Sequence, residues 1–141
     1  MKIPDSEKDK KAAQWAAFAD EDLRYAEHGL TLEPETPYRL VAYHAQQCAE
    51  KYLKAFLVYH KIDFPYTHNI SALLEVCENH ADWTEKLRDA EELTQFAITV
   101  RYPGEDEVVE KGEAIRAIEL ARQVKTVVRK ALSSLGMKLP E

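Results

Sequence analysis

Hydrophobic residues recur at steps of three and four over most of the chain, which is the spacing that gathers side chains on one face of an α-helix. The first stripe begins after Asp5 or Ser6, either of which is a good N-cap, and ends near Gly29. Its apolar members are Ala12, Trp15, Ala16, Ala19, Leu23, Ala26 and Leu30. No segment alternates with the two-residue period of a β-strand, so the pattern predicts helices throughout.

A second helix is expected over residues 38–60, because Thr36 is a favourable N-cap and Pro37 a favourable first helical residue. It should end before Pro65, since the residue preceding a proline avoids helical geometry. The side expected to face the core comprises Val41, Ala45, Cys48, Ala49, Tyr52, Ala55 and Phe56.

The rest of the chain predicts three further helices. A short one of about three turns should start at Asn69 and pass through Cys77. The fourth carries Trp83, Leu87, Ala90, Leu93, Ala97 and Val100, and ends before Pro103 and Gly104. The last carries Val108, Ile115, Ile118, Ala121, Val124, Val128, Ala131 or Leu132, and Leu135. The prediction is one all-α domain over residues 1–141, an up-and-down bundle of four long helices and one short helix, with a frayed tail at about 136–141.

The second helix also has a polar side. At about 100° per residue, a group of polar residues falls within an arc of about 160°: Arg39, His44, Gln46, Gln47, Glu50, Lys51 and Lys54. Leu40, Leu57 and Val58 interrupt this arc. Polar groups around exposed aliphatic side chains are common at subunit interfaces, but a solvated surface with a Glu50–Lys54 pair explains the same pattern.

Composition narrows the range of functions. With 141 residues, a net charge of −6 and a pI near 5.4, the chain is the size of one domain and unsuited to binding nucleic acid or membrane by bulk attraction. No run approaches the roughly 18 apolar residues of a membrane span, and the charged N-terminus is unlike a signal peptide. We therefore expect a cytoplasmic protein with no membrane partner, whose Cys48 and Cys77 are buried and reduced.

Several cofactor sites lack their motifs. A di-iron bundle needs Glu-x-x-His pairs, yet no histidine is preceded by glutamate at that position. The four glycines stand apart from one another, so there is no phosphate-binding glycine loop, and two distant cysteines make no zinc pattern. We expect neither a metal nor a cofactor.

The string Tyr43-His-Ala-Gln-Gln-Cys-Ala-Glu-Lys-Tyr-Leu-Lys-Ala-Phe-Leu57 resembles the signature helix of HEPN domains (higher eukaryotes and prokaryotes nucleotide-binding). The resemblance extends over nearly the whole chain, in the order expected. It includes Trp15, Asp22, Leu23 and Ala26, then Thr67-His68-Asn69-Ile70, then Arg101-Tyr102-Pro103.

This resemblance implies a helical bundle that forms a homodimer, is encoded beside a minimal nucleotidyltransferase as a toxin–antitoxin pair, and binds nucleotide or RNA. Many HEPN proteins are metal-independent ribonucleases with an Arg-x(4–6)-His motif near the start of the last core helix. Here the positions counted from Arg101 hold Asp106, Glu107 and Val108 in place of the histidine. Acidic residues would repel an RNA phosphate, so the resemblance favours binding over catalysis.

Two histidines are the alternative candidates for catalysis. His44 follows Arg39 at the right spacing, but an offset of about 140° on one helix separates the two side chains. His68 could do acid–base work near neutral pH, or it could bond to backbone groups and orient the turn before the third helix.

Arg101 is the third catalytic candidate. It could contact a phosphate through its planar fork, or pair with Glu105 or Glu50 as an anchor. Tyr102 either packs beneath the loop or stacks on a base. The residues predicted to face a ligand or an interface are Arg39, His44, Gln47, Glu50, Lys51, Lys54, Arg101 and Tyr102. Three functions stay open: a binding component, an endoribonuclease with a non-standard site, and a non-catalytic adaptor.

Overall fold

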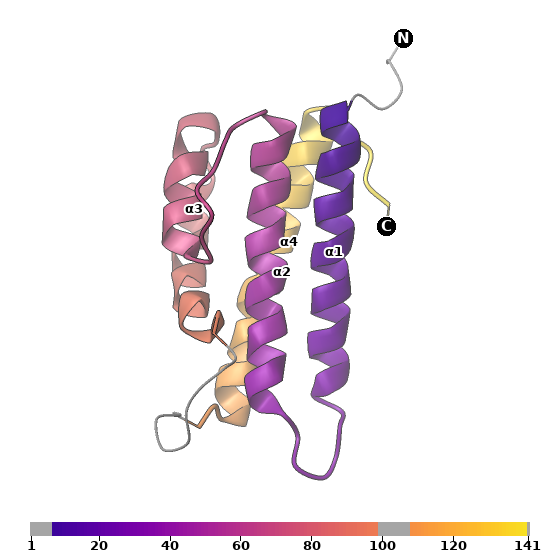
Figure 1. The fold of residues 1–141 in the computed structure, drawn as a ribbon, viewed down its shortest axis with the longest axis vertical. Coiled ribbons are helices and arrows are strands. Elements are labelled where there is room, and N and C mark those ends of the chain that lie inside the picture. The colour runs from indigo at the N-terminus through magenta and orange to yellow at the C-terminus, as the bar shows by residue number, and fades with distance from the viewer. Residues whose placement is uncertain (1–6, 99–107, 141) are drawn as a thin grey trace.

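The computed structural model describes residues 7–98 and 108–140. These residues form helices and connecting loops with no strand, which confirms the all-α prediction (Figure 1). The elements in chain order are α1 (Glu7–Gly29), α2 (Tyr38–Tyr59), α3 (Ile70–Cys77), η1 (Glu78–His80), η2 (Thr84–Phe96) and α4 (Lys111–Ser134). In Figure 1, α1, α2 and α4 run side by side along the long axis, while α3 and η2 flank α2 on the side away from α1.

Helix α2 is the centre of the bundle. It contacts α1, α3, η2 and α4, and its large side chains Tyr52, Leu53, Phe56 and Leu57 are almost completely buried. Residues on adjacent turns and on opposite sides of the helix are buried together, which is the mark of a helix enclosed by its neighbours rather than one lying on a surface.

The end of α1 approaches α2 very closely. A Cβ atom added at Gly29 would come within 2.8 Å of Val41 Cγ2, so the absence of a side chain at this position lets the two helices pack closely. The predicted cap of α2 was wrong. Pro37 occupies the N-cap position without a side-chain hydrogen bond, and Thr36 Oγ1 instead donates to the carbonyl oxygen of Leu32 at 2.6 Å, which ties the interhelical loop to itself.

Asp20 joins three helices. Its carboxylate accepts a hydrogen bond from the hydroxyl of Tyr52 in α2, lies 3.0 Å from Lys125 Nζ in α4 and 3.5 Å from an Arg129 nitrogen. Burial and the neighbouring carboxylate raise the pKa of Tyr52, so its hydroxyl keeps the proton that it donates. Directional bonds of this kind fix the rotation of α1 relative to the other two helices.

The fourth predicted helix exists, but it is a 3₁₀-helix. Side chains three positions apart eclipse one another in 3₁₀ geometry, and the residues of η2 at steps of three face inward: Thr84, Leu87, Ala90, Leu93 and Phe96. An α-helix was predicted from apolar residues at mixed steps of three and four. The buried residues of η2 recur at steps of three alone, which is the period of a 3₁₀-helix.

The last helix is shorter than predicted. It begins at Lys111, with the Glu110 amide donating to Glu113 Oε1 at 3.1 Å. Three residues predicted on its buried face are exposed. Val108 and Leu135 lie outside the helix, and Ile115 lies on its outer side. Beyond Ser134, Met137 packs into the core and Arg129 donates to the carbonyl oxygen of Pro140.

Two further predictions are confirmed. The Asn69 side chain caps α3 by accepting a hydrogen bond from the Ala72 amide at 3.0 Å. Cys48 and Cys77 are free and buried, and burial raises the pKa of both thiols, that of Cys77 to about 12. Among the helices of residues 7–98 and 108–140, none is long and apolar enough to cross a membrane.

Candidate functional site

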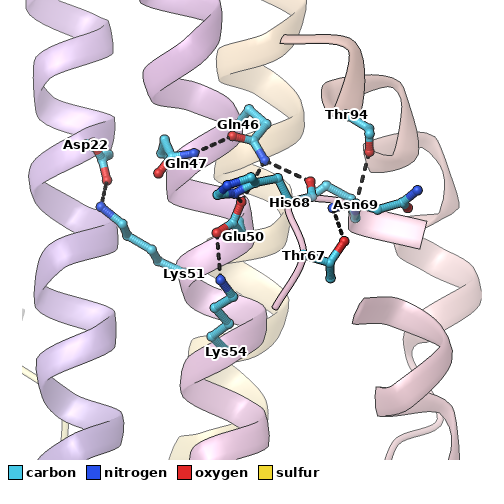
Figure 2. A network of polar contacts seen from close by, with 11 residues as sticks. Asp22, Gln46, Gln47, Glu50, Lys51, Lys54, Thr67, His68, Asn69 and Thr94 are labelled. Atoms are coloured by element: carbon cyan, nitrogen blue, oxygen red, sulfur yellow. Dashed lines mark hydrogen bonds and ion pairs between the residues drawn. The ribbon is translucent and has the colours of Figure 1, made fainter. Parts of the chain in front are cut away.

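The polar side of α2 is largely covered by other parts of the same chain. Gln46, Gln47, Glu50 and Lys54 are all buried, whereas the sequence had suggested a side facing solvent, a ligand or another subunit. The cover comes from α1 and from the segment preceding α3, which runs beside α2 on its α3 side in Figure 2. These four side chains therefore form a polar network inside one chain.

Glu50 is the hub of this network. Its Oε1 accepts hydrogen bonds from Gln46 Nε2 at 3.0 Å and from His68 Nδ1 at 2.8 Å, and its Oε2 accepts one from Lys54 Nζ at 2.8 Å (Figure 2). Burial raises the pKa of this carboxyl, but the hydrogen bonds from Lys54, Gln46 and His68 outweigh burial, so the pKa lies below its ordinary value of 4.5. Glu50 is therefore an ionised, fully paired carboxylate.

Gln46 connects the hub to the backbone. Its amide nitrogen also donates to the carbonyl oxygen of His68 at 3.2 Å, and its amide oxygen accepts from Gln47 Nε2 at 2.7 Å. The fully buried Gln46 amide therefore holds the main chain of the segment before α3, while Glu50 holds the His68 side chain, and together they leave this segment little freedom.

Lys54 is enclosed between two aromatic rings. Its ammonium nitrogen lies 5.6 Å from the ring centroids of both Trp15 and Phe64, which meet edge to face. A cation over aromatic faces is stabilised by their quadrupoles. The salt bridge to Glu50 and the contacts with the two rings together compensate the charge of this ammonium, so Lys54 has a structural role.

His68 is the member of the network that reaches the surface. Its side chain is 51% exposed, while that of Glu50 is 4% exposed. Because an ionised carboxylate can only accept hydrogen bonds, Nδ1 of His68 must carry the proton, and in the neutral ring the lone pair lies on Nε2. The exposed ring of Tyr66 lies 6.1 Å away. The carboxylate thus fixes both the tautomer and the orientation of a half-exposed imidazole.

The turn that carries His68 is tied on both sides. The Asn69 amide donates to Thr67 Oγ1 at 3.0 Å, and the Ile70 amide donates to Thr94 Oγ1 of η2 at 3.1 Å. The interpretation in which His68 only orients the turn is thus half right. Its carbonyl is held by Gln46, but its ring bonds to Glu50 and not to the backbone.

His44 has a matching arrangement on the α1 side of α2. Its Nδ1 bonds to Asp22 Oδ1 at 2.9 Å, and Lys51 Nζ lies 2.6 Å from the other oxygen of the same carboxylate. The ring of the exposed Tyr25 lies against the imidazole, with centroids 4.9 Å apart. His44 is therefore a second histidine whose tautomer is set by a carboxylate.

The structure thus separates the predicted site residues into groups. His44 and Lys51 join Asp22, while Gln47, Glu50 and Lys54 join His68, on the other side of α2. Arg39 is exposed near the start of α2. Arg101 and Tyr102 lie outside the described residues.

Sequence reasoning left two members of these clusters out of the site. Gln46 had been placed on the polar side, and its complete burial could not be read from the helical period. Asp22 was noted in the resemblance, but its spacing gives no sign of its partners in α2. Within residues 7–98 and 108–140, no group of three histidine, cysteine, aspartate or glutamate side chains is arranged to hold a metal ion.

Comparisons with known proteins agree with this architecture. The crystal structure of TT1696 from Thermus thermophilus is similar, with a TM-score of 0.69 and 25% sequence identity, over 85% of this chain and 97% of that one. The curated proteins give no match. The HEPN domain family matches residues 12–131, a range that contains α2, α3 and η2 entirely and most of α1 and α4. The chain belongs to the HEPN domain family.

Proposed function

We propose that this protein is a homodimeric component of a HEPN and minimal nucleotidyltransferase module of the toxin–antitoxin type, and that it binds nucleotide or RNA through the surface around His68. The observation that carries the proposal is the half-exposed imidazole of His68, fixed by a buried and fully paired Glu50, on a chain of the HEPN domain family.

The chemistry of this imidazole suits a nucleotide ligand. In its neutral form Nε2 accepts a hydrogen bond from a ribose hydroxyl or a base amino group, and in its protonated form it donates to a phosphate. The hydrogen bond to the Glu50 carboxylate fixes the orientation of the ring. A ligand thus meets a group whose direction is already set, so less conformational entropy is lost on binding.

Binding is favoured over catalysis because the sequence lacks the histidine expected after Arg101. Asp106 and Glu107 stand at two of the three possible positions. Without that histidine, the family's ribonuclease motif has no acid–base group at its usual place.

Titration with ATP and with a short single-stranded RNA, followed by fluorescence anisotropy or calorimetry, tests the proposal. We expect the wild-type chain to bind one of these probes and His68→Ala to bind it about tenfold more weakly, the effect of losing about 1.4 kcal/mol. His28→Ala is the matched control, because His28 is also exposed. Absence of binding, or equal losses in both variants, would contradict the proposal.

Exposed apolar side chains on the outer faces of α1 and α2 support the dimer. Phe18 is 43% exposed, Tyr25 70% and Leu40 40%, and aromatic side chains such as the first two are enriched at interfaces. Light scattering should give twice the chain mass of 16.2 kDa at micromolar concentration. A monomer would rule out this part of the proposal. Co-purification with a minimal nucleotidyltransferase, without any effect of nucleotide on the melting temperature, would favour the adaptor function instead.

One observation favours the endoribonuclease as the second candidate. His44 and His68 both have Nδ1 tied to a carboxylate, which leaves Nε2 of each ring to take up or release a proton, as acid–base catalysis requires. Cleavage of RNA in EDTA that disappears in both His44→Ala and His68→Ala would establish this activity. Cleavage that survives both substitutions would exclude these histidines.

A further inference from the structure

A concave surface lies apart from both histidine clusters. A pocket of about 640 Å³ opens between the C-terminal half of α4, the segment at residues 80–86 and Phe56 of α2. It shares no residue with the Glu50 network or with the Asp22 cluster. Its volume is within the range of pockets that hold small molecules, about 300–1,000 Å³.

The floor of this pocket is apolar and partly aromatic. Phe56 and Trp83 meet edge to face, with ring centroids 4.8 Å apart and an interplanar angle of 81°. Val127, Ala131 and Leu135 of α4 complete the apolar lining, and Leu135 is 48% exposed. Flat apolar bodies pack well against such a floor, because aromatic rings gain from both stacked and edge-on contacts.

The rim of the pocket carries uncommitted positive charge. Lys86 and Lys130 are exposed lining residues, and neither ammonium makes a salt bridge within the described part of the chain, whereas Lys51, Lys54 and Lys125 all do. Asp82 contributes the negative charge of the lining. Lysine, arginine, aspartate and glutamate alone give the chain a formal net charge of −6, and counted in the same way the two ammonium groups and one carboxylate give the rim one net positive charge.

We infer that this pocket binds a small aromatic monoanion of the aromatic carboxylate class, with its ring on the Phe56 and Trp83 floor and its carboxylate between Lys86 and Lys130. The single net positive charge of the rim matches a monoanion better than a phosphate dianion, which Asp82 would repel. The apolar floor supplies the affinity, and the two ammonium groups supply the preference for a charged ligand.

The experiment compares 2-naphthoate with its neutral analogue 2-naphthamide on the full chain, with NMR following the indole signal of Trp83 and calorimetry giving the affinities. Wild type should bind the naphthoate more tightly and shift the Trp83 signal. The double substitution Lys86→Gln and Lys130→Gln should weaken naphthoate binding about tenfold, as expected for two exposed charge contacts, and leave naphthamide binding unchanged.

A charge-matched control is the pair Lys10→Gln and Lys111→Gln, which removes two exposed lysines outside the pocket and should leave both affinities unchanged. Equal affinity for the two probes, a Trp83 signal that neither probe moves, or equal effects of the two double substitutions would overturn the inference. Tighter binding of a naphthyl phosphate would overturn the monoanion assignment. A dimer that dissociates only in the Lys86→Gln, Lys130→Gln variant would overturn it too, because another chain would then occupy the pocket.

Discussion

Two carboxylates of this protein are paired with cations, one in a buried and the other in an exposed environment. The Glu50 side chain is 4% exposed and is bonded by Lys54, Gln46 and His68. The Glu92 side chain is 47% exposed and is bonded by Arg116 alone, through Nε at 3.0 Å and a terminal nitrogen at 2.5 Å. The Glu92–Arg116 pair has a better hydrogen-bond geometry than the Glu50–Lys54 pair, since a guanidinium binds a carboxylate with two parallel bonds.

The difference teaches that burial, and not bond geometry, decides what each carboxylate contributes. Water replaces Arg116 readily if that pair is broken, so the pair contributes little to stability. Water cannot replace Glu50 as easily, because Lys54 and Gln46 would be left with buried, unsatisfied donors. Glu50 therefore couples α2 to the segment before α3, whereas Glu92 and Arg116 add little to the contact between η2 and α4.

Removal of the Glu50 carboxylate should produce the largest loss of stability. We expect Glu50→Ala to lower the free energy of unfolding by about 3 kcal/mol, because it leaves the Lys54 ammonium without its counter-charge in a buried place. Glu92→Ala is the matched control and should cost no more than about 0.5 kcal/mol. Urea denaturation measures both. Similar costs for the two substitutions would refute the distinction between the two regions.

The stabilisation by Glu50 should depend on pH. Because the pKa of Glu50 is lower in the folded chain than its ordinary value of 4.5, the folded state binds fewer protons than the unfolded state. The stabilisation is therefore present above pH 4.5 and is lost as the pH falls through the folded-state value. The stability difference between wild type and Glu50→Gln should shrink as the pH falls below 4.5, by more than that between wild type and Glu92→Gln. Parallel pH profiles would argue against it.

His68 should contribute less than Glu50. We expect His68→Ala to cost about 1 kcal/mol, since it removes one hydrogen bond to a charged group from a half-exposed ring and leaves Glu50 with two donors. The change should also speed hydrogen exchange at the Asn69 and Ile70 amides, which lie in the turn that His68 helps to hold. His28→Ala serves as the exposed control, and exchange that is equally fast in both variants would contradict the role of His68.

The smallest effect is expected at the surface. A double-mutant cycle with Arg116→Ala and Glu92→Ala should give a small coupling energy, which salt at about 1 M should reduce further. The same cycle on Lys54 and Glu50 should give a larger, salt-insensitive value. A strong coupling between Arg116 and Glu92 would mean that geometry outweighs burial after all.

Much of the fold could be predicted from local signals in the sequence. The long apolar stripes placed α1 and α2 within about one residue of their observed ends, Gly29 marked the end of α1, and Asn69 marked the start of α3. The family resemblance also rested on sequence alone, because its four groups of residues stand in order along the chain. Spacing between neighbours three or four positions apart therefore predicted where the helices lie, although for η2 it did not predict the type of helix.

The candidate site was predicted less well, because it depends on what covers α2. Helical periodicity correctly gathered Gln47, Glu50 and Lys54 on one side, but a period reports only that residues share a side. It cannot report that the segment before α3 lies over them.

The sequence by itself determined the helical architecture, the family and the chemical groups available, since these follow from local spacing and residue type. The tertiary structure decided which of those groups are buried, which carboxylate orients each histidine and where the Phe56–Trp83 pocket opens. The physical reason is that burial and tautomer depend on partners 18 to 27 positions away in sequence, such as Glu50 for His68, Asp22 for His44 and Trp83 for Phe56, and no local pattern records such contacts.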